Sequence, residues 1–548
     1  MSHLARYEVI ADTLGRHGIG YLVGAFGIDR WFPFHQGALG HERRAEPYAT
    51  PEHVRLALEE LGPVFIKLGQ LLSTRSDLLP AEYLAELAKL QDGTPPVESA
   101  AIQAVIRQEL GGEPEKLFRE FDRRPLASAS IGQAHAAILL DGTAVVVKVR
   151  RPAAVAQVEE DLEILRNLAA WSDRHSEVAR GYDLPGLVEE FSRTLRAELD
   201  YLHEARNAQR FAANFADDPA VHIPEVRWER TTSRVLTLDR VSGIKVDDLA
   251  ALDAAGIDRK ALAKRGANLL LGMIFNDRFF HADPHPGNLF VQPDGSIALI
   301  DFGMVGELDE ERRLALADFL AAFTRADADA LGSALVRLSV RKEVVDRDGL
   351  RASLEPFVSL YRGRALGDIG FAHLLTQLLA LLRKHHLQLP RDTVLLFKVL
   401  LMAEGMGAHL DPGFGLSELL GPYAERLIRE RYSPSAIAEQ LARSSVEGGR
   451  LMIELPERLR RILERLDEGG IEVHLRAAEL DPLMGRAERV GNRIVTGMLA
   501  AALINAVGQL VASDRRWRSW EGGLLGAGLG MVGTLGGYLL WTARRPRG

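Results

Sequence analysis

The sequence predicts an α+β protein with two lobes, preceded by a helical extension and followed by a hairpin of two transmembrane helices. A strand-like run, 127–140, and a β-branched run that ends at Lys148 meet at Asp141-Gly142, a pair that two-residue hairpin turns prefer. Helical patterns dominate residues 1–120 and residues 246–430. Near the C-terminus, two segments of twenty residues each carry no charge.

The most informative motif is His281-Ala-Asp-Pro-His-Pro-Gly-Asn288, which Asp301-Phe-Gly303 follows thirteen residues after the asparagine. Phosphoryl transfer needs an Asp on a loop, an Asn a few residues on and a second Asp nearby, to hold magnesium and to orient the attacking oxygen. Asp283, Asn288 and Asp301 provide these three groups. Either motif alone occurs by chance. Together, and in this order, they predict a protein-kinase-like nucleotide and metal site.

Lys148 ends the second strand of the predicted hairpin, where a kinase places the lysine that binds the α- and β-phosphates. Taken alone, such a lysine is more often a charged residue that protects a strand edge. A buried lysine needs a carboxylate partner, and the helix-like stretch 191–211 offers Glu198, Asp200 and Glu204. On one helix, Asp200 and Glu204 share a face while Glu198 is rotated away, so two separate acidic contacts are expected. The alternative is a solvated acidic face.

These residues and two further motifs resemble the UbiB family of atypical kinases, the bacterial relatives of mitochondrial proteins that support coenzyme Q biosynthesis. The resemblance runs from about residue 50 to about residue 475. The motifs that carry it, besides the two metal loops, are Lys67-Leu-Gly-Gln70, Ala127-Ser-Ala-Ser-Ile-Gly-Gln133, the strand ending at Lys148, and Glu198-Leu-Asp-Tyr201 with Glu204.

The resemblance implies a protein-kinase-like bilobal fold that uses ATP and Mg²⁺. It pairs Lys148 with Glu204, places Asp283 at the catalytic base position, and assigns magnesium to Asn288 and Asp301. An alanine-rich loop replaces the glycine-rich loop that covers ATP in ordinary kinases. Its nucleotide-binding residues here are Ala127, Ser128, Ala129, Ser130 and Ile131.

The alanine-rich loop departs from the family pattern at its second place, where Ser128 stands instead of alanine. A loop with Cβ atoms approaches phosphates less closely than glycine and is stiffer. Slow turnover and altered nucleotide selectivity are therefore expected, and the sequence leaves the preference between ATP and ADP open.

The Lys67 motif lies in a helical pattern over residues 51–71. The resemblance implies that this extension folds over the active site, where a peptide substrate would otherwise dock. Lys67 and Gln70 then take part in the site, with Lys67 facing Glu198 and Asp200. From the residues alone, a Lys and a Gln one helical turn apart suit a polar pair buried against a charge, or a lysine that reaches past apolar neighbours to solvent.

The segment after Asp301-Phe-Gly303 turns quickly into a predicted helix over 306–313, and no Ala-Pro-Glu anchor for a peptide platform follows. Phosphorylation of proteins is therefore not expected. ATP hydrolysis coupled to a lipid or a membrane complex, and phosphorylation of a small molecule, both remain open.

The run 235–241 leading into Ser242-Gly243 resembles the strand and hinge whose backbone binds adenine, and this would place Asp239 and Val241 at the cofactor. An ordinary edge strand is the alternative.

Composition excludes several classes of function. The chain of 548 residues contains no cysteine, so it has no disulfide framework, thiolate zinc site or cysteine nucleophile. Its net charge of -8, without a basic run interleaved with aromatics, does not favour nucleic acid as a partner. Residues 19–28, the longest apolar stretch near the N-terminus, are short and broken by glycine, unlike a secretory signal.

The uncharged segments are 494–513 and 522–541, each of which would rise about 30 Å as a helix, the thickness of a bilayer core. The second contains Gly526-x-x-x-Gly530 and Gly533-x-x-x-Gly537, which permit close packing of helices in lipid, within one chain or in a homodimer. A buried helical hairpin in a soluble core is the alternative. The two segments predict a multi-pass protein of the cytoplasmic (inner) membrane. Because ATP is in the cytoplasm, the kinase domain is expected on that side.

The predicted protein is therefore a membrane-anchored atypical kinase or ATPase that supports isoprenoid quinone (ubiquinone) biosynthesis. Its expected partners are the lipid bilayer, quinone precursors or other lipid-like molecules, and quinone-biosynthesis enzymes. Two alternatives remain, a nucleotide-sensing scaffold of a membrane complex and an ATP-driven extractor of lipid intermediates. The expected domains are an extension at 1–120, an N-lobe with inserted helices at 121–245, a C-lobe at 246–430, a helical tail at 431–490 and the transmembrane helices at 491–548.

Overall fold

The computed structural model describes residues 3–17, 50–90, 96–152, 154–175, 183–340, 346–361 and 370–433. All of them belong to one compact unit, Met1–Glu439. The predicted tail and both predicted transmembrane segments lie outside the described residues.

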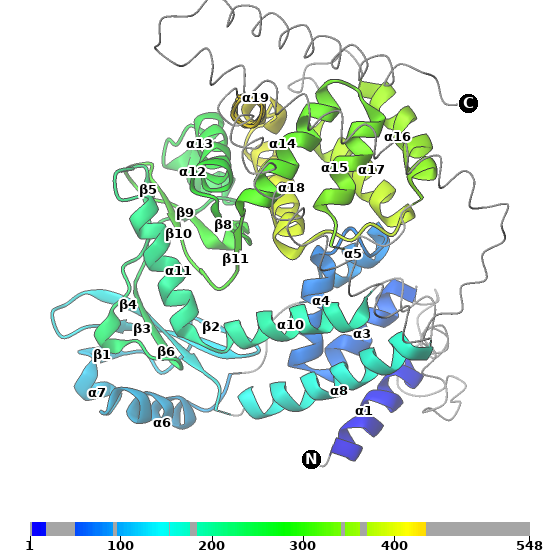
Figure 1. Cartoon of the computed structure of the whole chain (residues 1–548). Coiled ribbons are helices and arrows are strands. Elements are labelled where there is room, and N and C mark those ends of the chain that lie inside the picture. The colour runs from blue at the N-terminus through cyan, green and yellow to red at the C-terminus, as the bar shows by residue number, and fades with distance from the viewer. Residues whose placement is uncertain are drawn as a thin grey trace, which may run out of the picture. The chain divides into compact units, whose positions relative to one another are not determined.

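The N-terminal extension is helical, as expected (Figure 1). The predicted helical pattern over 51–71 is divided between two helices, because the chain turns at Gly62, whose φ of 97° suits glycine, and a new helix begins at Pro63. The helices of the extension and of the segment that leads into the N-lobe are α1 (His3–Arg16), α3 (Thr50–Leu61), α4 (Pro63–Thr74), α5 (Ala81–Leu87), α6 (Ser99–Leu110) and α7 (Pro114–Leu117).

The N-lobe is built on a five-stranded antiparallel sheet with the path β1-β3-β4-β6, to which β2 adds beside β3. The predicted hairpin is confirmed as β3 and β4. Val145, Val147 and Val149 are fully buried in one core with α6, so the alternation of β4 turns Lys148 to the opposite face. The strands are β1 (Glu120–Phe121), β2 (Ala127–Ser128), β3 (Gly132–Ile138), β4 (Ala144–Arg150) and β6 (Val235–Asp239).

The helices inserted in the N-lobe are α8 (Ala154–His175), α10 (Leu184–Glu198) and α11 (Tyr201–Asn214). A single helix across 191–211 is therefore wrong. Asp200 leaves the helical conformation, with φ −110° and ψ 98°, and its Oδ1 accepts a hydrogen bond from Leu202 N at 3.0 Å. It is the N-cap of α11, which separates Glu198 from Glu204 by a change of helix.

The extension and the inserted helices share a core of their own. Leu61 and Phe65 from the extension pack with Leu162, Phe191 and Leu195 from α8 and α10. Figure 1 shows α3 and α4 beside α8 and α10. The extension is thus packed against the inserted helices of the N-lobe by apolar burial.

The C-lobe combines short strands with helices around the largest core of the described residues. One sheet has the order β5-β10-β9-β7, and β8 pairs with β11 in a second. A helix begins within the predicted stretch 306–313, as α14 capped by Asp309, but residues 305–307 form a strand, β11, instead of its first turn. The elements are β5 (Val221–His222), β7 (Ile244–Lys245), α12 (Leu249–Ala254), α13 (Arg259–Gly272), β8 (Phe279–His281), β9 (Leu289–Val291), β10 (Ile297–Leu299), β11 (Val305–Glu307), α14 (Glu310–Thr324), α15 (Ala328–Leu338), α16 (Arg347–Tyr361), α17 (Phe371–Lys384), α18 (Arg391–Leu410) and α19 (Leu416–Arg431).

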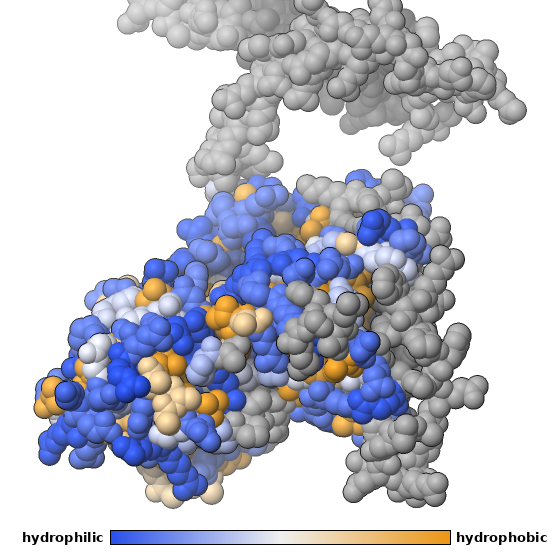
Figure 2. All heavy atoms as spheres, turned by 90° about the horizontal axis from the view of Figure 1, so that it is seen from below, coloured by the Kyte–Doolittle hydropathy of each residue, from blue (hydrophilic) through white to orange (hydrophobic). Residues whose placement is uncertain are grey.

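Within the described residues, α18 is the one helix that is long and apolar enough to cross a membrane. Its most apolar stretch is 56% buried, and Leu396, Val399 and Leu400 belong to the C-lobe core. These contacts are those of a core helix. On the face shown in Figure 2, the described surface is mostly hydrophilic and its apolar residues form small separate areas.

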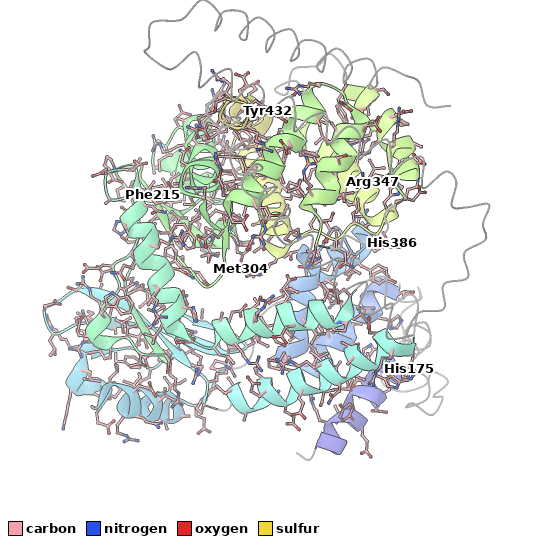
Figure 3. All side chains as sticks on the ribbon, in the orientation of Figure 1. His175, Phe215, Met304, Arg347, His386 and Tyr432 are labelled. Atoms are coloured by element: carbon pink, nitrogen blue, oxygen red, sulfur yellow. The ribbon has the colours of Figure 1, made fainter. Side chains whose placement is uncertain are left out.

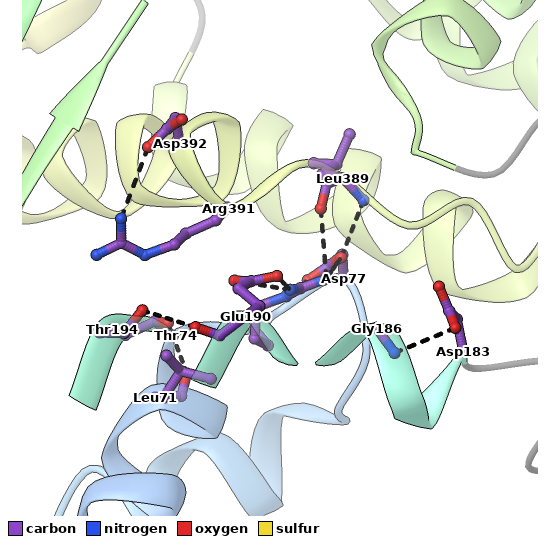
Figure 4. A network of polar contacts seen from close by, with 11 residues as sticks. Leu71, Thr74, Asp77, Asp183, Gly186, Glu190, Thr194, Leu389, Arg391 and Asp392 are labelled. Atoms are coloured by element: carbon purple, nitrogen blue, oxygen red, sulfur yellow. Dashed lines mark hydrogen bonds and ion pairs between the residues drawn. The ribbon is translucent and has the colours of Figure 1, made fainter. Parts of the chain in front are cut away.

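A buried polar network joins the loop after α4 to α10 and to the loop before α18 (Figure 4). The Arg75 guanidinium donates to Asp77 at 2.9 and 2.8 Å and to Glu190 at 3.2 Å. Asp77 in turn accepts from Leu389 N at 3.1 Å, and Leu389 O accepts from Arg75 at 3.3 Å. The side chains of Arg75 and Asp77 are only 3% and 0% exposed. This network fixes the extension against the segment from which α18 begins.

Candidate active site

Lys148 lies between two carboxylates. Its Nζ is 2.5 Å from Glu204 Oε1 and 3.7 Å from Asp301 Oδ1. The lysine comes from β4, the glutamate from α11 and the aspartate from the loop after β10, so three separate segments meet here. The pairing of Lys148 with Glu204 that the resemblance implies is therefore present.

Glu204 also holds the loop that carries Asp301. Its Oε1 accepts from Phe302 N at 3.3 Å, and Asn207, one turn further along α11, donates from Nδ2 to Phe302 O at 2.9 Å. Helix α11 thus contacts both Lys148 and the loop that carries Asp301. Figure 3 shows Met304, in the same loop, at the boundary between the two lobes.

The electrostatics of this cluster favour a cation in addition to Lys148. Burial alone would lower the pKa of Lys148, but Asp301 and Glu204 together raise it above its ordinary value, so the ammonium stays charged. Lys148 lowers the pKa of Asp301, which therefore stays ionised, whereas burial raises the pKa of Glu204. Asp301, which is ionised and half exposed, is therefore the carboxylate of this cluster that can bind a metal ion.

Asp301 has a strained backbone, with φ 64° at a residue that is not glycine. Two hydrogen bonds maintain this conformation: Gly303 N donates to Asp301 Oδ1 at 3.2 Å, and His281 Nε2 donates to Asp301 O at 2.6 Å. The side chain is half exposed, and Oδ2 takes part in none of these contacts. Strain of this kind commonly marks a functional residue.

His281 is buried and binds both functional loops. Its Nε2 donates to Asp301 O, while Nδ1 accepts from Asp283 N at 3.2 Å. Only a neutral imidazole with its proton on Nε2 can make both bonds. Burial lowers the pKa of His281 below the ordinary value of 6.5, in agreement with this neutral form.

Acidification is therefore expected to destabilise the fold through His281. Because its pKa is lower in the folded chain than in the unfolded chain, protons bind preferentially to the unfolded chain once the pH falls below 6.5. The melting temperature should fall between about pH 7.5 and about pH 5, and it should fall less in a His281→Gln variant. His135, whose pKa burial also lowers, is unchanged in both proteins, so the difference between them isolates His281. Equal decreases in both would contradict this role.

The loop that carries Asp283, the predicted catalytic base, runs from β8 through a short 3₁₀ turn, Pro286–Asn288, into β9. Asn288 Nδ2 donates to Asp283 O at 3.1 Å, and Ile300 N donates to Asn288 O at 3.0 Å. The first bond orients the loop, and the second connects Asn288 to the residue before Asp301. The Asp283 carboxylate is 40% exposed, and its Oδ1 accepts from Lys398 Nζ at 2.7 Å.

The predicted magnesium ligands fit a kinase-type metal position. Asn288 uses its Nδ2 in the loop, which leaves the carbonyl oxygen Oδ1 out of that bond, and Asp301 has a half-exposed side chain whose Oδ2 is outside the contacts described above. Among the described residues, no three His, Cys, Asp or Glu side chains form a closed metal site. Mg²⁺ takes few protein ligands and completes its shell with water and phosphate oxygens, so one carboxylate and one amide suffice.

Arg151 donates several hydrogen bonds to the alanine-rich loop. Its Nη2 donates to Ser128 Oγ at 2.9 Å and its Nε to Ala129 O at 2.9 Å, while its backbone N donates to Ile131 O at 2.9 Å. Ser128, the departure from the family pattern, thus adds a hydrogen bond that an alanine could not accept. Ser130 is buried, whereas Ala127 is exposed. These bonds agree with the expected stiffness of the loop.

Asp239, in the predicted hinge, has partners within the protein. Asp239 ends β6, but its carboxylate accepts from Arg227 at 2.7 and 2.8 Å, and its backbone N donates to Glu225 O. A cofactor contact through either group would have to displace these partners. Val241 makes no hydrogen bond among the described residues, and its contact with a nucleotide stays a prediction.

The extension does reach the site. Lys67, on α4, lies 3.1 Å from Glu198 Oε2 at the end of α10, and its charge contributes to the lowered pKa of Asp301. The two separate acidic contacts that we expected are therefore present, from two helices instead of one. Gln70 donates to Leu90 O at 3.1 Å, and Asp200 caps α11, so both hold the local backbone.

Comparison with known proteins agrees with this geometry. The ABC1 atypical kinase-like domain matches residues 89–335, and the UbiB helical domain matches residues 354–415. A probable protein kinase UbiB of Xanthomonas oryzae is 37% identical over 462 residues, which cover 82% of this chain and 83% of that relative. The chain belongs to the UbiB family. Its α+β kinase-like fold follows from that membership.

Two further comparisons are less informative about function. An uncharacterized protein of Synechocystis, sll1770, is 38% identical over 437 residues, 79% of this chain and 75% of that relative. A solved structure described as the complex of Rv3197 with erythromycin, from Mycobacterium tuberculosis, matches with a TM-score of 0.46 and 24% identity, over 69% of this chain and 94% of that chain.

The sequence analysis missed Lys398, which comes from the UbiB helical domain and contacts the predicted catalytic Asp283. One signal could have revealed it. Lys398 stands alone as a charged residue between Leu395 and Ala403, in a helix whose neighbouring positions are apolar and mostly buried.

Proposed function

We propose that this UbiB-family protein binds Mg-ATP in the cleft between its lobes and transfers the terminal phosphoryl group to water or to a small acceptor, in support of isoprenoid quinone biosynthesis. The observation that carries the proposal is the position of Lys148 between Glu204 and Asp301, with the loop of Asp283 and Asn288 fixed to Asp301 through His281. This set has the ammonium, the metal ligands and the base that phosphoryl transfer needs.

Each residue has a definite part in the proposed reaction. Lys148 binds the α- and β-phosphates, and Glu204 keeps its ammonium in place. Asn288 and Asp301 would hold Mg²⁺, which would supply the positive charge that neutralises the phosphates. Asp283 accepts the proton of the attacking hydroxyl as its oxygen bonds to the γ-phosphorus, and the bond to the β-phosphate oxygen breaks to release ADP.

A small acceptor or water suits the site better than a protein substrate does. The segment after Asp301 goes directly into β11 and α14 and forms no long activation loop. Helix α4 contacts both α10 and α18 and brings Lys67 to Glu198, on the side where the resemblance places a peptide in ordinary kinases. The relative in Xanthomonas oryzae is named a probable protein kinase. A direct assay with protein substrates distinguishes protein phosphorylation from transfer to water or to a small acceptor.

Membrane attachment and the quinone pathway rest on sequence. The uncharged segments 494–513 and 522–541 support a cytoplasmic-membrane location, and the family resemblance supports the pathway. Quinone precursors, other lipid-like molecules and quinone-biosynthesis enzymes are the proposed partners. The ion pair between Lys67 and Glu198 favours one second candidate, a nucleotide-sensing scaffold, because a nucleotide that moves α4 would signal its presence to a membrane complex.

The test is the quinone content of a strain that lacks this protein. Wild-type protein should restore the quinone, whereas Asp283→Asn, produced at the same level in the membrane fraction, should let precursors accumulate. If both proteins restore the quinone, the scaffold explains the function. If the deletion leaves the quinone unchanged, the proposed pathway is wrong.

A further inference from the structure

Helix α18 carries a lysine where its surroundings favour an apolar residue. Leu395, Phe397 and Val399 around it are no more than 7% exposed, and the Lys398 side chain itself is only 24% exposed. Placing an ammonium in such a helix costs free energy unless a partner compensates it. That partner is Asp283, at 2.7 Å.

The other two lysines that reach the site are already committed to carboxylates. Lys148 contacts Glu204 and Asp301, and Lys67 contacts Glu198. Lys398 approaches from the side of Asp283, where the proposed mechanism places the γ-phosphoryl group. A cation is needed there, because charge spreads over the three equatorial oxygens of the transferred group.

We propose that Lys398 binds the γ-phosphoryl group, so that the helical domain completes the active site of the kinase-like domain. The inference rests on the function proposed above. In the nucleotide-free structure Lys398 pairs with Asp283, and with ATP bound its ammonium lies between the Asp283 carboxylate and the γ-phosphate oxygens. It thereby orients Asp283 toward the attacking hydroxyl and neutralises the transferred group.

A purely structural tie between two domains is the competing explanation. Both partners are partly exposed, at 24% for Lys398 and 40% for Asp283, and ion pairs of that kind contribute little to stability. If Lys398 has only this structural role, its replacement should lower the melting temperature without nucleotide and should change the affinities for all nucleotides equally. Contact with the γ-phosphoryl group predicts an effect on ATP that is absent for ADP.

The experiment compares the affinities of the full-length protein for ADP and for a non-hydrolysable ATP analogue, with Mg²⁺ present. In Lys398→Met, the affinity for the analogue should fall by about tenfold or more, because a hydrogen bond to a charged group is lost. The affinity for ADP should stay within about twofold, and ATP turnover should fall by about 100-fold. Lys398→Arg should retain most of the preference for the analogue.

Lys384→Met is the matched control. Lys384 is also in the helical domain but donates to Ser353 Oγ, away from the catalytic loop, so its replacement should change neither affinity. Should Lys398→Met unfold, Lys398→Gln, which can still hydrogen-bond Asp283 but lacks the charge, tests the same ratio of affinities.

Each outcome separates the two proposals. If wild-type protein binds both nucleotides and Lys398→Met keeps the wild-type ratio, the role of Lys398 is wrong while the proposed function stands. If Lys398→Met weakens both nucleotides equally and melts at a lower temperature, the lysine is a structural tie. If wild-type protein binds neither nucleotide, the proposed function is itself wrong.

Discussion

Replacing Asp301 by asparagine is expected to lower Mg-ATP turnover by about 100-fold or more while the protein stays folded. The substitution removes the only carboxylate among the two predicted metal ligands, so Mg²⁺ loses its main charged contact. The side-chain oxygen that accepts from Gly303 N can remain, because asparagine retains one. Lys148 keeps Glu204 as its partner at 2.5 Å, and the fold therefore loses no essential ion pair.

The measurement is ATP hydrolysis by full-length protein in membranes, as a function of Mg²⁺ concentration. Asp309→Asn is the control, because Asp309 caps α14 only eight residues away and asparagine caps a helix equally well. Its turnover should match that of wild type. An Asp301→Asn variant with turnover close to wild type would remove Asp301 from the metal site.

Replacing Asp77 by alanine is expected to destabilise the fold by about 3–5 kcal/mol, the usual effect of leaving a buried charge without its partner. Arg75 is 3% exposed and would keep Glu190, at 3.2 Å, as its one carboxylate partner among the contacts of this network, together with the carbonyl of Leu389 at 3.3 Å. Leu389 N would also lose its acceptor. The substitution would therefore weaken the contacts between the loop after α4 and the segment before α18.

Urea unfolding of wild type and Asp77→Ala measures this effect. Asp329→Ala is the matched control, because Asp329 pairs with Arg351 in an exposed ion pair and its removal should change stability little. If the two variants unfold at the same urea concentration, the buried network does not stabilise the fold as proposed.

The sequence predicted the parts of the site that lie in compact motifs. The hairpin with Lys148 and the helix that begins at Asp309 follow from turn and capping residues that act locally. Asp283, Asn288 and Asp301 stood in one recognisable order, and the structure joins their loops through His281. Glu204 could be selected over Asp200 only through the family resemblance.

Long-range features were beyond a reading of local patterns. The apolar periodicity of 191–211 continues across Leu199 and Asp200, so the change from α10 to α11 depends on the dihedral angles of one capping residue. The contact of Lys398 with Asp283 spans 115 positions in the chain, and no local pattern encodes such a distance. The ion pair of Asp239 with Arg227 joins residues that are 12 positions apart, and the sequence pattern of the strand does not indicate it.

The three lysines of the site have a practical consequence for dissecting this protein. Only Lys148 lies within the kinase-like domain at 89–335, whereas Lys67 precedes it and Lys398 follows it. A fragment cut at the domain boundaries would retain Lys148, Glu204, Asp283 and Asp301 but lose two of the three ammonium groups around them. Activity measured on such a fragment would describe an incomplete site, and expression trials should therefore begin with fragments that extend from α3 to α19.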